Sequence, residues 1–136
     1  EGRKLIAWGH SLGGPVCAQA AQYMHADALV LETTTPSTRA AVDTMVGWAR
    51  PFVRIHIAPN LNGIDIPAAL QGYSGKVVVL EAGRDDTLPA SLSRRLAREL
   101  EAEGVKVEHL SFPQAGHNDV GEQPDFQTRV AAALGL

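Results

Sequence analysis

Apolar residues are grouped along the chain in short runs that alternate with longer amphipathic segments. Runs typical of buried strands occupy residues 5–8, 28–31, 76–80 and 105–110. Segments of helical character follow each run, at about residues 12–23, 37–50, 89–103 and 125–134. Strands that alternate with helices are expected to pair in parallel through right-handed crossovers. The pattern therefore predicts an α/β protein with a parallel sheet of about four strands.

The fourth apolar run alternates apolar and polar residues, which favours an edge strand. The least regular stretch, residues 51–75, is interrupted by proline and glycine. With 136 residues, 45% of them hydrophobic, the chain is long enough to form one domain with a core, and we treat residues 1–136 as a single domain.

Composition excludes several classes of function. A net charge of −3 without a cluster of basic residues argues against a nucleic-acid partner. One cysteine allows no internal disulfide, and the five histidines show no metal-ligand spacing, so we expect neither a metal nor another cofactor. No apolar run approaches the roughly 20 residues of a membrane span, and no signal peptide opens the chain. A membrane partner is not indicated, and we expect a cytoplasmic protein.

The segment from Gly9 to Gly14, Gly-His-Ser-Leu-Gly-Gly, lies between the first predicted strand and the first predicted helix. A serine in a tight glycine turn between strand and helix is typical of a nucleophile elbow, in which the hydroxyl projects beyond the sheet. In that turn Gly9 and Gly13 are expected to be small because side chains there would collide, and Gly14 to let the helix approach the strand. The spacing matches neither a P-loop, which needs a lysine after its spacer, nor a dinucleotide-binding turn.

Acidic and histidine side chains follow the third and fourth predicted strands. Asp85 and Asp86 come after residues 76–80, and His117 comes after residues 105–110. The carboxyl ends of parallel strands meet at one edge of a sheet, which is also the edge that carries Ser11. A serine hydroxyl needs a base to remove its proton and an acid to orient that base. The order serine, acid, histidine is the one found with this kind of elbow.

The chain resembles the C-terminal half of an α/β-hydrolase, from the strand before the nucleophile to the final helix. Three motifs carry the resemblance: Gly-His-Ser-Leu-Gly-Gly, Gly-Arg-Asp-Asp-x-x-Pro and Ala-Gly-His-Asn-Asp. The last is similar to that of esterase-like or peptidase-like branches with a Gly-His-Asn-Asp ending. The resemblance implies a serine hydrolase with Ser11 as nucleophile, Asp86 as orienting acid and His117 as base.

The acid is chosen by the spacing that the resemblance implies, three residues after Gly83, which is Asp86. Asp85 is the next candidate, and Glu32 at the end of the second strand is the third. His10 is expected to pack beside the nucleophile rather than to act as base. Asp119 is expected to steady the histidine loop.

The resemblance also implies an oxyanion hole, with the backbone N–H of Leu12 as one donor at the start of a helix. The second donor would come from a loop after an earlier strand, which this chain does not contain. A complete α/β-hydrolase has four further strands before this point, so we expect a piece of a longer protein. Such a piece would be weak or inactive alone. Its first strand would have an unpaired edge, and the chain would self-associate or dock with the missing N-terminal half.

Residues 33–75 correspond to the region between strands that sets specificity in this fold, and we expect a cap-like insertion there. Trp48 and Phe52 are its candidate substrate-binding residues. The expected substrate is a small molecule with an acyl group, held as an ester or a thioester, with a peptide bond as second choice. The alternatives are a non-catalytic hydrolase-fold module that binds a ligand or partner, or one half of a split enzyme.

Overall fold

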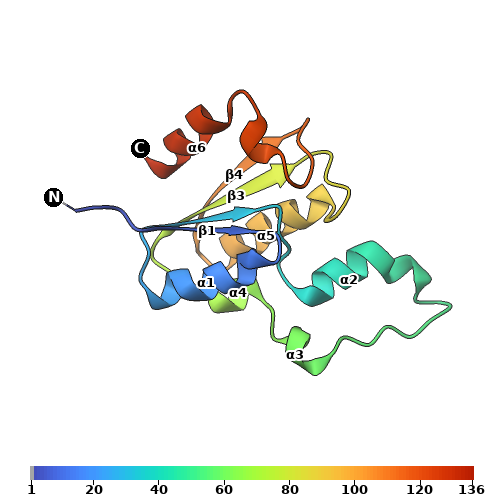
Figure 1. Cartoon of the computed structure of the whole chain (residues 1–136). Helices are drawn as coiled ribbons and strands as arrows, with labels where there is room; N and C mark the ends of the chain where they lie inside the picture. The colour runs from blue at the N-terminus through green and yellow to red at the C-terminus, as the bar shows by residue number, and fades with distance from the viewer. Residues whose placement is uncertain (1) are drawn as a thin grey trace.

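The computed structural model describes residues 2–136. Within this range, four strands form one parallel sheet in the order β1-β2-β3-β4 (Figure 1). The strands are β1 (Ile6–His10), β2 (Ala28–Glu32), β3 (Lys76–Ala82) and β4 (Lys106–Phe112). Each begins within one residue of its predicted start. The predicted four-stranded parallel sheet is therefore confirmed, and β4 is an edge strand as its alternating sequence indicated.

The helices that connect the strands are of two kinds, long ones that the sequence predicted and short ones that it did not. They are α1 (Gly13–Tyr23), α2 (Thr38–Val46), α3 (Pro59–Asn62), α4 (Ile66–Ala69), α5 (Ala90–Ala102) and α6 (Phe126–Leu134), with 3₁₀ turns at Gly47–Ala49 and Val120–Glu122. The two four-residue helices, α3 and α4, are too short to produce a visible period in the sequence.

Three helices cover one face of the sheet and one covers the other. α1, α4 and α5 lie on the first face, and α6 lies on the second (Figure 1). The first core is built around Leu29, Leu31 and Val79, and the second around Val30, Val78 and Leu80. Both faces of β2 and β3 are thus buried, which explains why these strands read as continuous apolar runs.

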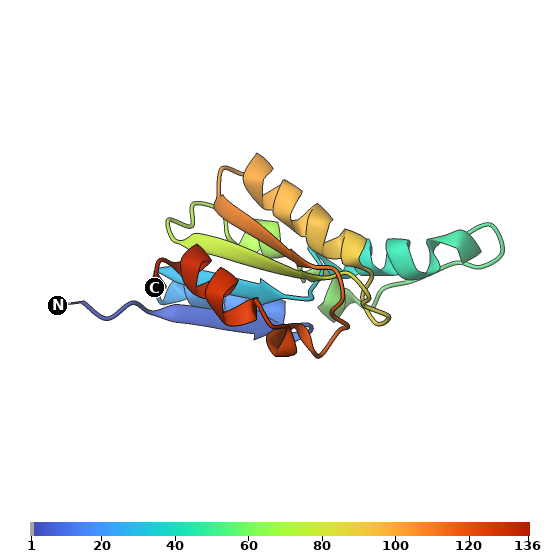
Figure 2. The ribbon, with the colours of Figure 1, turned by 90° about the horizontal axis from the view of Figure 1, so that it is seen from above.

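The segment between β2 and β3 differs from the prediction. The helical segment that we expected over residues 37–50 is present, as α2 followed directly by the 3₁₀ turn at Gly47–Ala49, but it projects from the body of the protein together with the chain that follows (Figure 2). The sheet is covered instead by α4, whose Ile66 and the following Leu70 are fully buried. α4 fills this place because Asp65 caps it and aims its apolar residues at α1 and α5.

The outer edge of β1 is less buried than the inner strands. Trp8 and Leu5 are partly exposed, and a shallow apolar groove of about 400 Å³ lies between β1 and α6. Trp8 forms one side of the groove, with its ring centroid 6.0 Å from that of Phe126. Among residues 2–136, no helix is long and apolar enough to cross a membrane.

Candidate active site

Ser11 occupies a sharp turn between β1 and α1 at the carboxyl edge of the sheet. Its backbone has φ 52°, in the left-handed region that residues other than glycine rarely adopt. Three hydrogen bonds hold the turn: Ser11 N donates to Glu32 O at 2.9 Å, Gly14 N donates to Ser11 O at 3.1 Å, and Thr34 Oγ1 donates to Ser11 O at 2.7 Å. The strain is thus stabilised by the end of β2 and the residues after it.

Close packing requires two glycines around Ser11: Gly9, which we predicted to be small, and Gly14, which we predicted to allow a close approach. A Cβ at Gly9 would lie 2.8 Å from the backbone of Gly13 and Gly14, and one at Gly14 would lie 2.5 Å from Thr34 Oγ1. A Cβ at Gly13 would meet nothing within 4 Å. The prediction that Gly13 must be small is wrong, because its α-carbon faces open space on the first turn of α1.

His117 lies in the loop after β4 and joins the nucleophile. Its Nε2 is 2.9 Å from Ser11 Oγ, within hydrogen-bond distance, and its side chain is 9% exposed. The ring is therefore held against the serine hydroxyl in a site that excludes most water. The structure brings Ser11 and His117 together as the sequence predicted.

The carboxylate that contacts the His117 ring belongs to Asp85 rather than Asp86. Asp85 Oδ2 lies 2.7 Å from His117 Nδ1, and its side chain is only 2% exposed. The other oxygen, Oδ1, accepts from the backbone N–H of Thr87 at 2.9 Å and of Leu88 at 2.8 Å. Asp86 is exposed, and its carboxylate lies 3.4 Å from Thr87 Oγ1. The predicted contact between Asp86 and His117 is therefore wrong.

The turn after β3 explains this one-residue difference. Gly83 N donates to Phe112 O and Arg84 N donates to Ala115 O, both at 2.9 Å, so the acid loop stays paired with the histidine loop through residue 84. A Cβ on Gly83 would lie 2.5 Å from Pro113 O, which shows how closely the two loops approach. The chain turns immediately after this pairing, and Asp85 is the residue that faces His117.

The other acidic candidates have different partners. Glu32 accepts a hydrogen bond from Trp8 Nε1 at 2.9 Å, on the side of β2 that faces the groove. Asp119 Oδ1 accepts from Gly116 N at 2.5 Å and so fixes the loop one residue before His117, as expected from the sequence.

The backbone of His117 is held by two side chains from neighbouring strand ends. His10 Nε2 donates to His117 O at 2.9 Å, and Thr33 Oγ1 donates to the same oxygen at 3.3 Å. The ring centroids of His10 and His117 are 5.1 Å apart. Thr33 is buried and has φ 46°, rare for a β-branched residue. Sequence reasoning missed Thr33, because no local pattern signals a contact across 84 residues.

Leu12 directly follows the nucleophile and is the N-cap residue of α1. At this end of a helix the first N–H groups have no partner within the helix, and the dipole favours negative charge. The position is therefore the one expected of the predicted oxyanion donor.

An apolar cavity of about 130 Å³ opens beside Ser11. Trp48 and Phe52 do not line it. Their side chains are 76% and 82% exposed on the projecting segment after α2. The structure does not bring these predicted substrate-binding residues to the nucleophile, because the chain turns away from the sheet at the end of α2.

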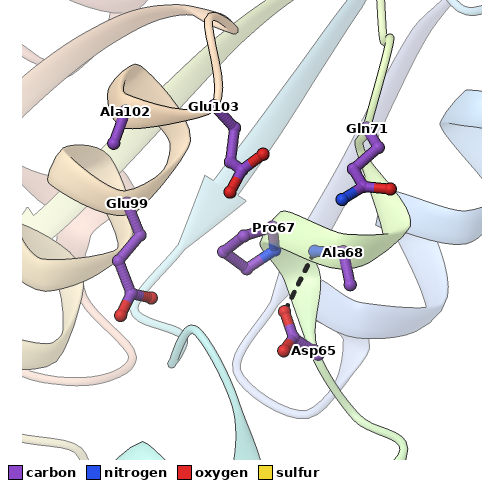
Figure 3. Close-up of a pocket in the computed structure, with 7 residues that line it drawn as sticks. All are labelled: Asp65, Pro67, Ala68, Gln71, Glu99, Ala102 and Glu103. Atoms are coloured by element: carbon purple, nitrogen blue, oxygen red, sulfur yellow. Dashed lines mark hydrogen bonds between the residues drawn. The ribbon is translucent and has the colours of Figure 1, made fainter.

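A larger hollow of about 410 Å³ lies between α4 and α5, where Glu99, Glu103 and Asp65 give it an acidic lining (Figure 3). It holds neither the serine nor the histidine, and Asp65 is engaged there in capping α4 through the N–H of Ala68. Its α5 residues lie toward the far end of the helix from the Asp85 loop, which precedes Ala90. Within residues 2–136 no group of three or more metal-ligating side chains is clustered.

Comparison with proteins of known structure identifies the fold. No protein-family model and no curated protein matches the sequence. The structure is similar to the acylaminoacyl peptidase of Pyrococcus horikoshii, with a TM-score of 0.70 and 13% identity over 98% of this chain and 24% of that one. The chain has the α/β-hydrolase fold.

Two esterase structures show the same fold likeness. An acetyl ester-xyloside bifunctional hydrolase from Caldicellulosiruptor lactoaceticus has a TM-score of 0.68 and 15% identity over 94% of this chain and 56% of that one. A carboxylesterase from Lactobacillus plantarum has a TM-score of 0.63 and 15% identity over 90% and 48% of the two chains. The present chain thus spans between about a quarter and a little over half the length of these three hydrolases.

Proposed function

We propose that this chain is the nucleophile-bearing part of a serine hydrolase that cleaves a carboxylic ester or thioester. The observation that carries the proposal is the pair of contacts that His117 makes, from Nδ1 to Asp85 Oδ2 at 2.7 Å and from Nε2 to Ser11 Oγ at 2.9 Å. A buried carboxylate that accepts from Nδ1 keeps the other nitrogen, Nε2, free to accept the serine proton. The likeness in fold to esterases and a peptidase is consistent with this chemistry.

In the proposed reaction, Ser11 Oγ attacks the carbonyl carbon of the substrate while its proton passes to His117 Nε2. The tetrahedral oxyanion is stabilised by the N–H of Leu12. The bond to the alcohol or thiol then breaks, and His117 returns the proton to the leaving group. A water molecule, deprotonated by His117, next hydrolyses the acyl-serine and regenerates the free hydroxyl.

Full activity is proposed to need a second oxyanion donor from outside residues 1–136. Removal of one donor typically lowers the rate by about 10²–10³-fold, so the isolated chain is expected to be a slow hydrolase. Reaction with a fluorophosphonate is the suitable test, because it requires an activated serine but no deacylation. We expect a mass increase of the intact chain, absent in Ser11→Ala and strongly reduced in His117→Ala. No labelling under any condition would contradict the proposal.

A second candidate, half of a split enzyme, is favoured by the edge of β1. This strand carries the serine turn, yet its outer side is unpaired within residues 2–136 and borders the apolar groove of Trp8 and Phe126. We propose that a further strand, supplied by polypeptide outside residues 1–136, pairs with β1 and covers the groove. The greater length of the similar hydrolases supports this occupant.

A further inference from the structure

The cavity beside Ser11 is walled by residues from five parts of the chain, most of them apolar or threonine. They are Leu12 and Pro15 from the start of α1, Thr34 and Thr35 from the segment after β2, Thr38 and Ala41 from α2, Ile64 from the turn before α4, and Leu88 from the loop before α5. Ser11 forms part of its wall. The nucleophilic residue of the proposed reaction therefore borders the cavity, which is formed largely by residues 33–75.

We infer that this cavity is the acyl-binding pocket and that it selects a short, uncharged alkyl chain of about four to six carbons. The inference rests on the proposed function and specifies its substrate. The volume of about 130 Å³ is slightly below the roughly 150 Å³ of an apolar cavity that holds benzene, a molecule of six carbons. A longer alkyl chain would extend out of the cavity and gain no further buried contact there.

The position of the imidazole decides which half of an ester enters the cavity. His117 Nε2 must deliver a proton to the leaving group, so the leaving group has to lie beside the histidine ring. His117 does not line the cavity, whereas Ser11 and Leu12 do. The cavity is thus on the side of the serine that the acyl chain occupies.

The polar groups on its wall do not favour a charged chain. Thr34 Oγ1 donates to Ser11 O at 2.7 Å, and Thr35 Oγ1 donates to Ser37 O at 2.9 Å. Thr38 also lines the cavity, and no charged side chain does. A charged acyl group would lose its hydration there without an oppositely charged partner.

The test uses a series of p-nitrophenyl alkylphosphonates from methyl to octyl, reacted with the whole 136-residue chain. Ser11 Oγ forms the bond to phosphorus, the bond to nitrophenolate breaks, and the serine proton passes to His117. Released nitrophenolate gives the rate, and intact mass gives the site occupancy. We expect the rate to rise about fourfold per buried methylene group up to butyl or hexyl, and to rise no further at octyl.

Two variants on one helix provide the decisive comparison. Ala41→Leu fills the cavity and is expected to abolish the preference for butyl and hexyl over methyl. Thr44→Leu adds the same side chain at an exposed position of α2 and should keep the original profile. If the rate did not depend on chain length, or depended on it identically in the two variants, the assignment of the acyl pocket would be wrong. The proposed function would be unaffected by that result. No reaction with any phosphonate would contradict the proposed function instead.

A binding measurement tests the pocket separately from reactivity. In Ser11→Ala, which keeps the other walls, hexan-1-ol is expected to shift the methyl resonances of Ile64 and Leu88. Absence of any shift there at saturating hexan-1-ol would overturn the inference even if Ser11 reacts as proposed.

Discussion

Asp85 and His117 are joined by a 2.7 Å contact between Oδ2 and Nδ1, and both side chains are almost fully removed from water. The second carboxylate oxygen of Asp85 is fixed by the backbone N–H groups of Thr87 and Leu88, later in the same loop. One side chain therefore ties the loop after β3 to the base after β4, and its geometry leads directly to the first prediction.

Asp85→Asn is expected to reduce the rate of fluorophosphonate labelling by about 10³–10⁴-fold, since an amide can hold the imidazole in the wrong tautomer. Asp86→Asn removes a carboxylate of the same kind one residue away, at an exposed position, and should stay within about twofold. Stopped-flow or mass-resolved labelling of both variants distinguishes them. A larger loss in Asp86→Asn would refute the assignment of the acid.

Glycine substitutions around the nucleophile are expected to separate by position. Gly9→Ala and Gly14→Ala place a Cβ under 3 Å from neighbouring atoms and should each lower the free energy of unfolding by about 2 kcal/mol or more. Gly13→Ala faces open space in the first turn of α1 and should stabilise the protein by about 0.4–1 kcal/mol. Urea denaturation of the three variants measures these changes in the free energy of unfolding. Equal effects at Gly13 and Gly14 would argue against the structure of the turn.

Thr33 is predicted to position the base through the backbone of His117. Thr33→Val removes the hydroxyl that donates to His117 O and should lower the free energy of unfolding by about 1–3 kcal/mol. It should also slow labelling and move the His117 imidazole resonances in an NMR pH titration. Thr33→Ser keeps the donor and serves as the control. If valine and serine behave alike, the hydroxyl does not hold the histidine.

The edge of β1 is expected to drive association of the isolated chain. Light scattering should give a mass that rises with protein concentration, because an apolar strand edge pairs readily with another strand. Leu5→Lys, just before β1, should weaken this association. Leu61→Lys in α3 changes a leucine of similar exposure, 43% against 40%, and should not. A stable monomer with full esterase activity would be inconsistent with the split-enzyme proposal.

Tyr73 should give the stability a dependence on alkaline pH. Burial, and secondarily the charge of Asp27, raise the pKa of the Tyr73 phenol above its usual value near 10. The folded state therefore holds this proton more tightly than the unfolded state. The resulting stabilisation is complete below about pH 10 and is lost as the pH rises through the folded-state pKa. Tyr73→Phe should show a shallower fall in unfolding free energy above pH 10 than the native chain.

The sequence by itself determined the four strands, the four longer helices that follow them, and the edge of the sheet at which the chemistry lies. Buried strands such as residues 76–80 show their burial directly in their composition, and parallel strands bring their carboxyl ends to one edge. Ser11 and His117 follow from that rule, since Ser11 comes directly after β1 and His117 lies in the loop after β4. Such information is local, and a single sequence contains it.

Only the tertiary structure decided which of two adjacent aspartates meets the base. The pairing of residues 83 and 84 with the histidine loop sets where the chain turns, and that pairing spans about 30 residues of sequence. The contact of Thr33 with His117, the requirement for Gly14 rather than Gly13, and the walls of the cavity have the same origin. Each depends on the distance between segments that are remote in the chain, and side-chain periodicity carries no record of that distance.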